Sequence, residues 1–112
     1  MKYVLIFGGE PTAHEAVSAP EDYSVQAEIA HWWARARSAG KVLASVRLKP
    51  PLTATTIRFD NQPPLICDGP STPEAEAVAG YGVIDVDDFD EALSLVRAWP
   101  GGGYVEIRPI LQ

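Results

Sequence analysis

The chain has 112 residues, 46% of them hydrophobic, which suits one globular domain, residues 1–112, with a single core. Nine Lys and Arg against fifteen Asp and Glu give a formal net charge of -6, which argues against nucleic acid as a partner. One cysteine cannot form an internal disulfide, and two histidines do not make a zinc site. The composition therefore predicts a cytoplasmic protein without a metal or other cofactor.

The first predicted element is a strand at residues 2–8. Its large apolar side chains alternate, with Tyr3, Leu5 and Phe7 on one face and Val4 and Ile6 on the other. This apolar run is too short for a signal peptide and far below the ~20 residues of a membrane span. We therefore expect a strand that is buried on both faces and no contact with a membrane.

A helix is predicted to follow a loop that contains His14. The sequence SAPE at residues 18–21 has a capping-box pattern with proline in the first turn, and Gly40 is suited to end the helix. An apolar stripe runs along it, formed by Val25, Ile29, Trp32 and Ala36, with Trp33 at its edge. The tryptophans are therefore interpreted as packing residues, while His31 lies away from the stripe.

The rest of the chain alternates predicted strands with one further helix. Strands are expected at residues 42–48, 53–59, 65–67, 80–86 and 104–110, and the turn DNQPP makes a hairpin of the second and third of these. The segment at 87–99 reads as a helix capped by Asp88, with Glu91 three residues later. Capping explains the acidic cluster there better than calcium does, because the spacing of a calcium loop is absent.

This order predicts an α+β fold: a ferredoxin-like βαβ-βαβ plan with an inserted β-hairpin. Both helices would cover one face of the sheet. The other face would be open, although the first strand is apolar on both sides, and a large exposed apolar face is typical of an interaction surface. Two copies packed sheet against sheet, a dimeric α/β barrel, would close it.

Five blocks in this order resemble the YCII-related family whose members carry a DGPF motif. They are MKYVLIFGGE, TATTIRF, DGP at Asp68 to Pro70, GYGVIDVDDFDEAL and VEIRP. The resemblance implies a bacterial protein with the dimeric α/β barrel fold. It also implies small-molecule chemistry with a His and Asp pair in some relatives, and an association with extracytoplasmic-function sigma factors in others.

Two residues are candidates for catalysis. Asp68 stands at the end of an apolar strand and could be a general acid or base; its other interpretation is a turn residue whose carboxylate accepts backbone N–H groups. His31 could be a base titrating near neutrality, or a solvated or interface histidine. The family's helix histidine aligns with Ile29, so the resemblance does not support a His and Asp pair here.

Four residues are candidates for ligand binding. Tyr104, Glu106 and Arg108 share one face of the last strand, opposite the expected helix-packing face, and are expected to point into the space between sheets. They form either a polar patch in which Arg108 holds a small acid, or a structural ion pair across the dimer interface. Ser71, which stands where the family has Phe, is the fourth candidate.

The sequence therefore predicts a homodimer that binds a small organic molecule. If it is an enzyme, a cofactor-free lyase, isomerase or dehydrochlorinase-like activity is expected, with Asp68 moving a proton. The alternative is a non-catalytic accessory or regulatory module that acts through a protein partner such as a sigma factor.

Overall fold

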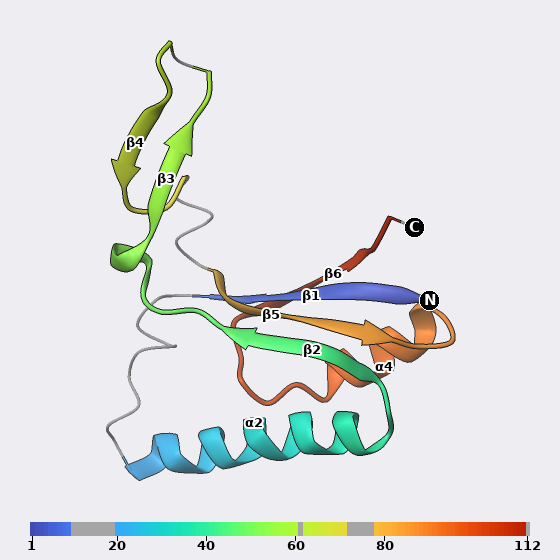
Figure 1. Ribbon diagram of the computed structural model, residues 1–112. Helices are drawn as coiled ribbons and strands as arrows, with labels where there is room; N and C mark the ends of the chain where they lie inside the picture. Colours follow the sequence, from blue (N-terminus) through green and yellow to red (C-terminus); the bar gives the residue numbers. More distant parts are fainter. Residues whose placement is uncertain (10–19, 61, 72–77, 112) are drawn as a thin grey trace.

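The computed structural model describes residues 1–9, 20–60, 62–71 and 78–111, and within them the chain has an α+β fold (Figure 1). The strands are β1 (Lys2–Gly8), β2 (Val42–Arg47), β3 (Thr55–Arg58), β4 (Leu65–Asp68), β5 (Val78–Asp85) and β6 (Tyr104–Pro109). The helices are α2 (Pro20–Ser38) and α4 (Phe89–Arg97), with a short 3-10 turn η1 (Pro51–Thr53). The predicted order of elements is confirmed, while the capping box at residues 18–21 and the loop with His14 extend beyond the described residues.

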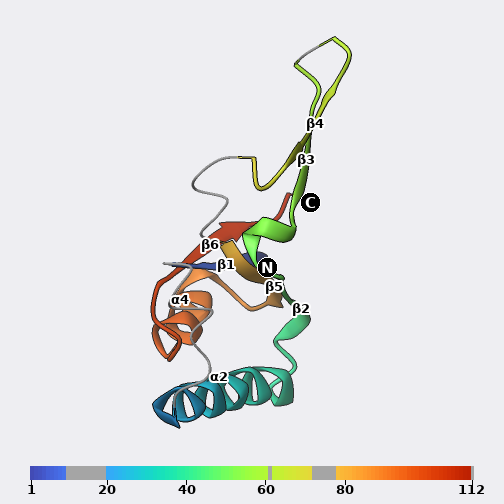
Figure 2. The same ribbon diagram turned by 90° about the vertical axis from the view of Figure 1, so that its left-hand side faces the viewer.

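The main sheet has four antiparallel strands in the order β2-β5-β1-β6, which is compatible with a ferredoxin-like fold. Both helices lie on one side of this sheet, as predicted (Figures 1 and 2). Strands β3 and β4 form a separate two-stranded sheet, the predicted hairpin, which we call the arm. In both views the arm extends from the sheet on the side away from the helices.

Alternation along β1 divides the sheet into two faces. Tyr3, Leu5 and Phe7 are buried beneath the helices, whereas Val4 and Ile6 point to the other side and are only partly buried. The expectation that β1 is buried on both faces is met in a single chain only on the helix-facing side.

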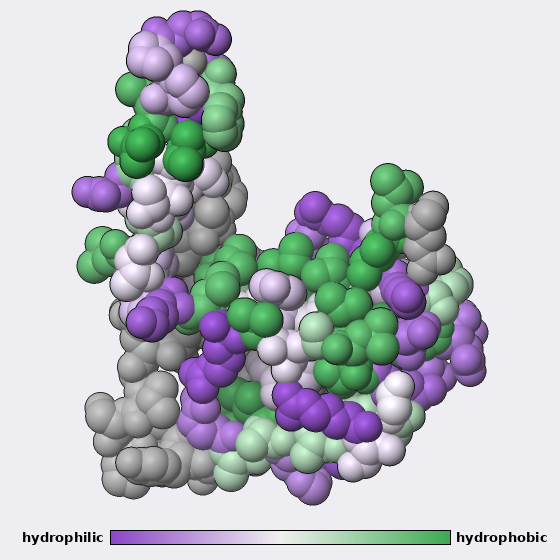
Figure 3. Space-filling model, in the orientation of Figure 1, coloured by the Kyte–Doolittle hydropathy of each residue, from purple (hydrophilic) through white to green (hydrophobic). Residues whose placement is uncertain are grey.

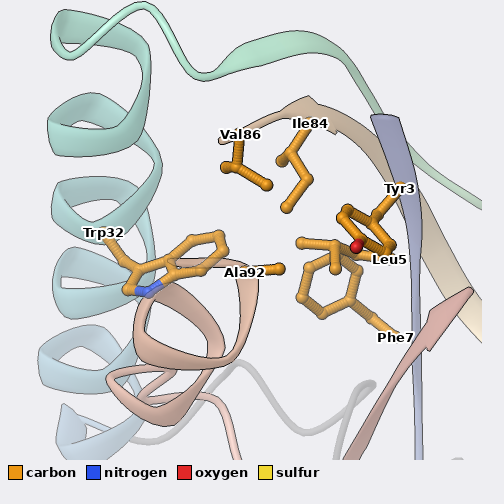
Figure 4. Close-up of a cluster of buried hydrophobic side chains, with 7 residues drawn as sticks. All are labelled: Tyr3, Leu5, Phe7, Trp32, Ile84, Val86 and Ala92. Atoms are coloured by element: carbon orange, nitrogen blue, oxygen red, sulfur yellow. The ribbon is translucent and has the colours of Figure 1, made fainter. Parts of the chain in front are cut away.

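The core lies between the sheet and the two helices (Figure 4). Its buried side chains are Tyr3, Leu5, Phe7, Trp32, Ile84, Val86 and Ala92. The ring of Trp32 lies within 6.2 Å of Phe7 and 5.0 Å of Trp99, centroid to centroid, and its Nε1 donates a hydrogen bond to the carbonyl of Leu95. Trp32 is therefore a packing residue, as predicted.

The predicted helix boundaries follow from local chemistry. Helix α2 ends before Gly40, whose φ of 74° is the left-handed conformation that glycine adopts at low cost. Helix α4 begins after Asp88, whose carboxylate accepts a 2.8 Å hydrogen bond from the backbone N–H of Glu91. The apolar stripe predicted for α2 is only partly buried. Its residues Trp32 and Ala36 are buried, but Val25, near the beginning of the helix, is 37% exposed. The stripe was therefore predicted too long at its N-terminal end.

An ion pair between Lys41 and Glu91 joins the segment before β2 to the first turn of α4. Lys41 Nζ lies 2.8 Å from Glu91 Oε1, and both side chains are about one-third exposed. The hydrogen bond from Lys41 lowers the pKa of Glu91, and the same bond raises the pKa of Lys41. The pair therefore couples the stability of the fold to pH.

We expect Glu91→Gln to lower the melting temperature at neutral pH and to have no effect in strong acid. Because the folded-state pKa of Glu91 is depressed, its stabilisation is present above the unfolded-state pKa and is lost as pH falls through the folded-state pKa. Because the folded-state pKa of Lys41 is raised, the stabilisation from Lys41 is present at neutral pH and is lost only when the pH rises through that folded-state pKa. Thermal unfolding followed by circular dichroism across the acid range tests this; an equal difference at every pH would contradict it.

Candidate functional site

The face of the sheet opposite the helices, which we call the open face, is defined by the pairing register. Tyr81 and Val83 of β5 lie opposite Ile6 and Val4 of β1, so their side chains share this face. The same register adds residues of both edge strands. The open face comprises Lys2, Val4, Ile6, Ala44, Val46, Tyr81, Val83, Asp85, Tyr104, Glu106 and Arg108. Its centre is apolar, and its most polar edge is β6.

The predicted alternation of β6 is confirmed. Glu106 and Arg108 pair with Ile6 and Val4 on the open face, while Val105 and Ile107 face the helices and pack against the core. Tyr104 begins the strand on the open side and is 44% exposed. Three polar side chains therefore follow one another along the edge of an apolar sheet, at a spacing of ~7 Å between alternate residues.

Glu106 and Arg108 form an ion pair on this face. Arg108 Nη2 lies 2.5 Å from Glu106 Oε2, and the side chains are 66% and 43% exposed respectively. Glu106 Oε2 is buried, and Arg108 is the charged partner that the described residues supply to it. Because the Arg108 side chain is largely exposed, its remaining N–H groups can contact a further polar group.

Asp68 lies at the base of the arm and is exposed. It is the last residue of β4, opposite Thr55, and on the same side of the arm as Ile57 and Ile66. Nothing in the described part of the chain encloses its carboxylate, so the apolar enclosure that made it a candidate acid or base is absent in one chain. Ser71 is also exposed, and its carbonyl accepts a hydrogen bond from Arg58.

His31 lies on the helical side of the molecule. It lines a shallow groove between α2 and the end of α4 with Ala27, Glu28, Arg35, Ala98 and Pro100. The arm extends from the opposite side of the sheet (Figures 1 and 2). The structure therefore does not bring His31 and Asp68 together.

The sequence interpretation expected an open apolar face from the first strand but did not assign Val46 and Tyr81 to it. Val46 and Tyr81 are 38% and 40% exposed in the single chain, directly opposite each other on β2 and β5. Gly80, Gly82 and Ile84 in GYGVIDV alternate with Tyr81 and Val83, so the period of two could have assigned these residues to the open side. The open face therefore presents an apolar surface over the sheet and polar groups along β6.

None of the helices in the described part of the chain is long and apolar enough to cross a membrane. A protein of Rhizobium meliloti (strain 1021), described as uncharacterized, is 30% identical to the chain over 114 residues. The match covers 98% of this chain and 92% of that protein. The YCII-related domain matches residues 1–112. The chain therefore belongs to the YCII-related family.

Proposed function

We propose that this protein is a homodimer that binds a small organic acid between two sheets. In this proposal two open faces pack against each other in a dimeric α/β barrel, and the β6 residues Tyr104, Glu106 and Arg108 line the polar end of the space between them. Support comes from the partly exposed apolar side chains at the centre of the open face, Val46 and Tyr81 among them. Water contact with this surface is removed when a second sheet covers it.

The observation that carries the ligand class is the Glu106–Arg108 pair. Arg108 has five N–H donors, and the pair with Glu106 Oε2 engages only part of them, so the guanidinium can also bind an anionic group. The Glu106 carboxylate accepts several hydrogen bonds, and Arg108 occupies only part of that capacity. A carboxylic acid that also carries a hydroxyl or amine would therefore bind Arg108 through its carboxylate and Glu106 through its donor.

We expect Arg108→Gln to weaken the binding of such acids. A panel of small hydroxy and amino acids is screened by thermal shift and isothermal titration calorimetry. At least one acid should raise the melting temperature of the wild-type protein, because a ligand that binds only the folded state stabilises it. Loss of a charge-assisted contact is expected to weaken binding by a factor of ~10 or more.

Arg97→Gln is the matched control, because Arg97 is also an exposed arginine but lies in the last turn of α4, on the helical side. It should leave the affinity unchanged. The proposal is contradicted if no acid in the panel binds, or if the Arg108 and Arg97 variants bind the same acid equally well.

A non-catalytic accessory module is the second candidate, and the separation of His31 from Asp68 favours it. Helices lie outside two sheets packed face to face, so a second copy would not bring His31 to the open face either. Proton NMR of the bound acid over several hours separates the candidates: an unchanged acid favours the module, and a converted one favours an enzyme. Cys67 is a free, exposed thiol, which fits the reducing cytoplasm as the location we propose.

A further inference from the structure

The arm is an apolar extension with little support from its own chain. Ile57 and Ile66 lie directly opposite each other on one side of the hairpin and are 50% and 73% exposed, and Phe59 beyond them is 74% exposed. Figure 3 shows hydrophobic surface on the arm and on the body of the molecule beside it. A two-stranded hairpin is at best marginally stable in water by itself, so these side chains are suited to packing against another surface.

The shape of the chain reflects this extension. The radius of gyration is 16.0 Å, whereas a compact domain of 112 residues has a value of about 13 Å. The molecule measures 48 by 42 by 17 Å along its principal axes, so it is broad and thin. A single chain therefore leaves more apolar surface in water than a compact fold of the same size.

We propose that the arm clasps a second copy of this chain, with the Ile57 and Ile66 side of each arm packed against the other copy. The inference rests on the homodimer of the proposed function and adds to it the element that holds the copies together. The arm rises on the open side of the sheet, where the second sheet would lie (Figures 1 and 2).

The length of the arm fits this arrangement. Two sheets that pack face to face are ~10 Å apart. The four paired residues of each arm strand span ~13 Å at ~3.4 Å per residue, before the residues of the tip are added. The arm is therefore long enough to pass the midplane between the sheets and reach the second copy.

The area of the open face gives a second argument that the arm packs against another copy of this chain. Four strands ~4.8 Å apart with about six residues each give a projected area on the order of 400 Å². A stable interface buries ~800 Å² on each partner. The exposed apolar side chains of the arm add to the surface that the sheet offers, so sheet and arm together suit one interface.

The proposed dimer also predicts where the Asp68 side chain lies. It lies on the same side of the arm as Ile57 and Ile66, two residues after Ile66 on β4. In the dimer its carboxylate therefore faces the second copy at the margin of the space between the sheets.

The test measures the dimer dissociation constant by analytical ultracentrifugation for Ile66→Asp and Cys67→Asp. The two residues are neighbours on β4, both exposed, and point to opposite sides of the arm. Ile66→Asp should raise the dissociation constant by ~10-fold or more, because it places a charge in a buried apolar contact. Cys67→Asp should leave it within about twofold of wild type.

Ile57→Asp is the second variant on the apolar side and should behave as Ile66→Asp does. Far-UV circular dichroism confirms that each variant is folded. If the wild-type protein is a dimer and neither isoleucine variant changes its dissociation constant, the arm proposal is overturned and the homodimer stays in place. Equal effects of Ile66→Asp and Cys67→Asp would have the same meaning. A monomeric wild-type protein would overturn the homodimer itself.

Discussion

Trp32→Ala is expected to destabilise the fold by about 3–5 kcal/mol, as large truncations of buried aromatic side chains do. Trp32 is 2% exposed and is the largest fully buried side chain. Its ring lies between helix α2 and Phe7 of β1 (Figure 4) and also packs against Trp99 beyond α4. A domain of this size has a total stability of roughly 5–15 kcal/mol, so much of the folded population would be lost on heating.

Trp32→Phe is the control for this substitution. It keeps a ring in the core but removes the Nε1 donor, which leaves the Leu95 carbonyl without its 3.0 Å hydrogen bond. The cost should be clearly smaller, about 1–3 kcal/mol. Urea unfolding followed by tryptophan fluorescence and circular dichroism measures both variants. A Trp32→Ala protein within ~1 kcal/mol of wild type would show that the ring does not hold the layers together.

Gly103→Ala is expected to have the second large effect, a loss of about 3 kcal/mol or more. Gly103 has φ 67° and precedes β6, and an added Cβ would overlap the backbone carbonyl oxygen of Gly8. Because the obstructing atom belongs to the backbone of β1, relief requires the strands to separate where Gly8 pairs with Tyr104. The variant therefore combines left-handed strain with overpacking.

Gly102→Ala is the matched control, since Gly102 has almost the same φ of 69° but an added Cβ would meet nothing within 4 Å. Strain alone should cost ~1 kcal/mol. Urea midpoints of the two variants separate the two contributions. Equal midpoints would contradict the steric account, because the φ angles are alike and an added Cβ meets the Gly8 backbone only at position 103.

Elements with strong local patterns were predicted well from the sequence. Asp88 was recognised as a helix cap from its spacing to Glu91, and Gly40 as a helix end, because capping chemistry depends on a few adjacent residues. The two faces of β6 were also predicted correctly, since alternation along a strand determines which side chains share a face.

The direction of the arm could not be predicted from the same patterns. The β-branched residues and turn of the hairpin predict two paired strands, which are present, but pairing does not determine where a hairpin points. The exposure of Asp68 follows from that direction, and so does its distance from the helical layer that carries His31. Spatial relations between elements depend on tertiary packing, which a strand period does not encode.

Sedimentation equilibrium of the wild-type protein over the micromolar concentration range tests the central claim most directly, because the proposed ligand site and the clasping arm both require two copies. We expect a species with twice the protomer mass of 12.1 kDa that dissociates only on dilution. A single species of 12.1 kDa at every concentration would contradict the pairing of the open faces and, with it, the site that the pairing would enclose.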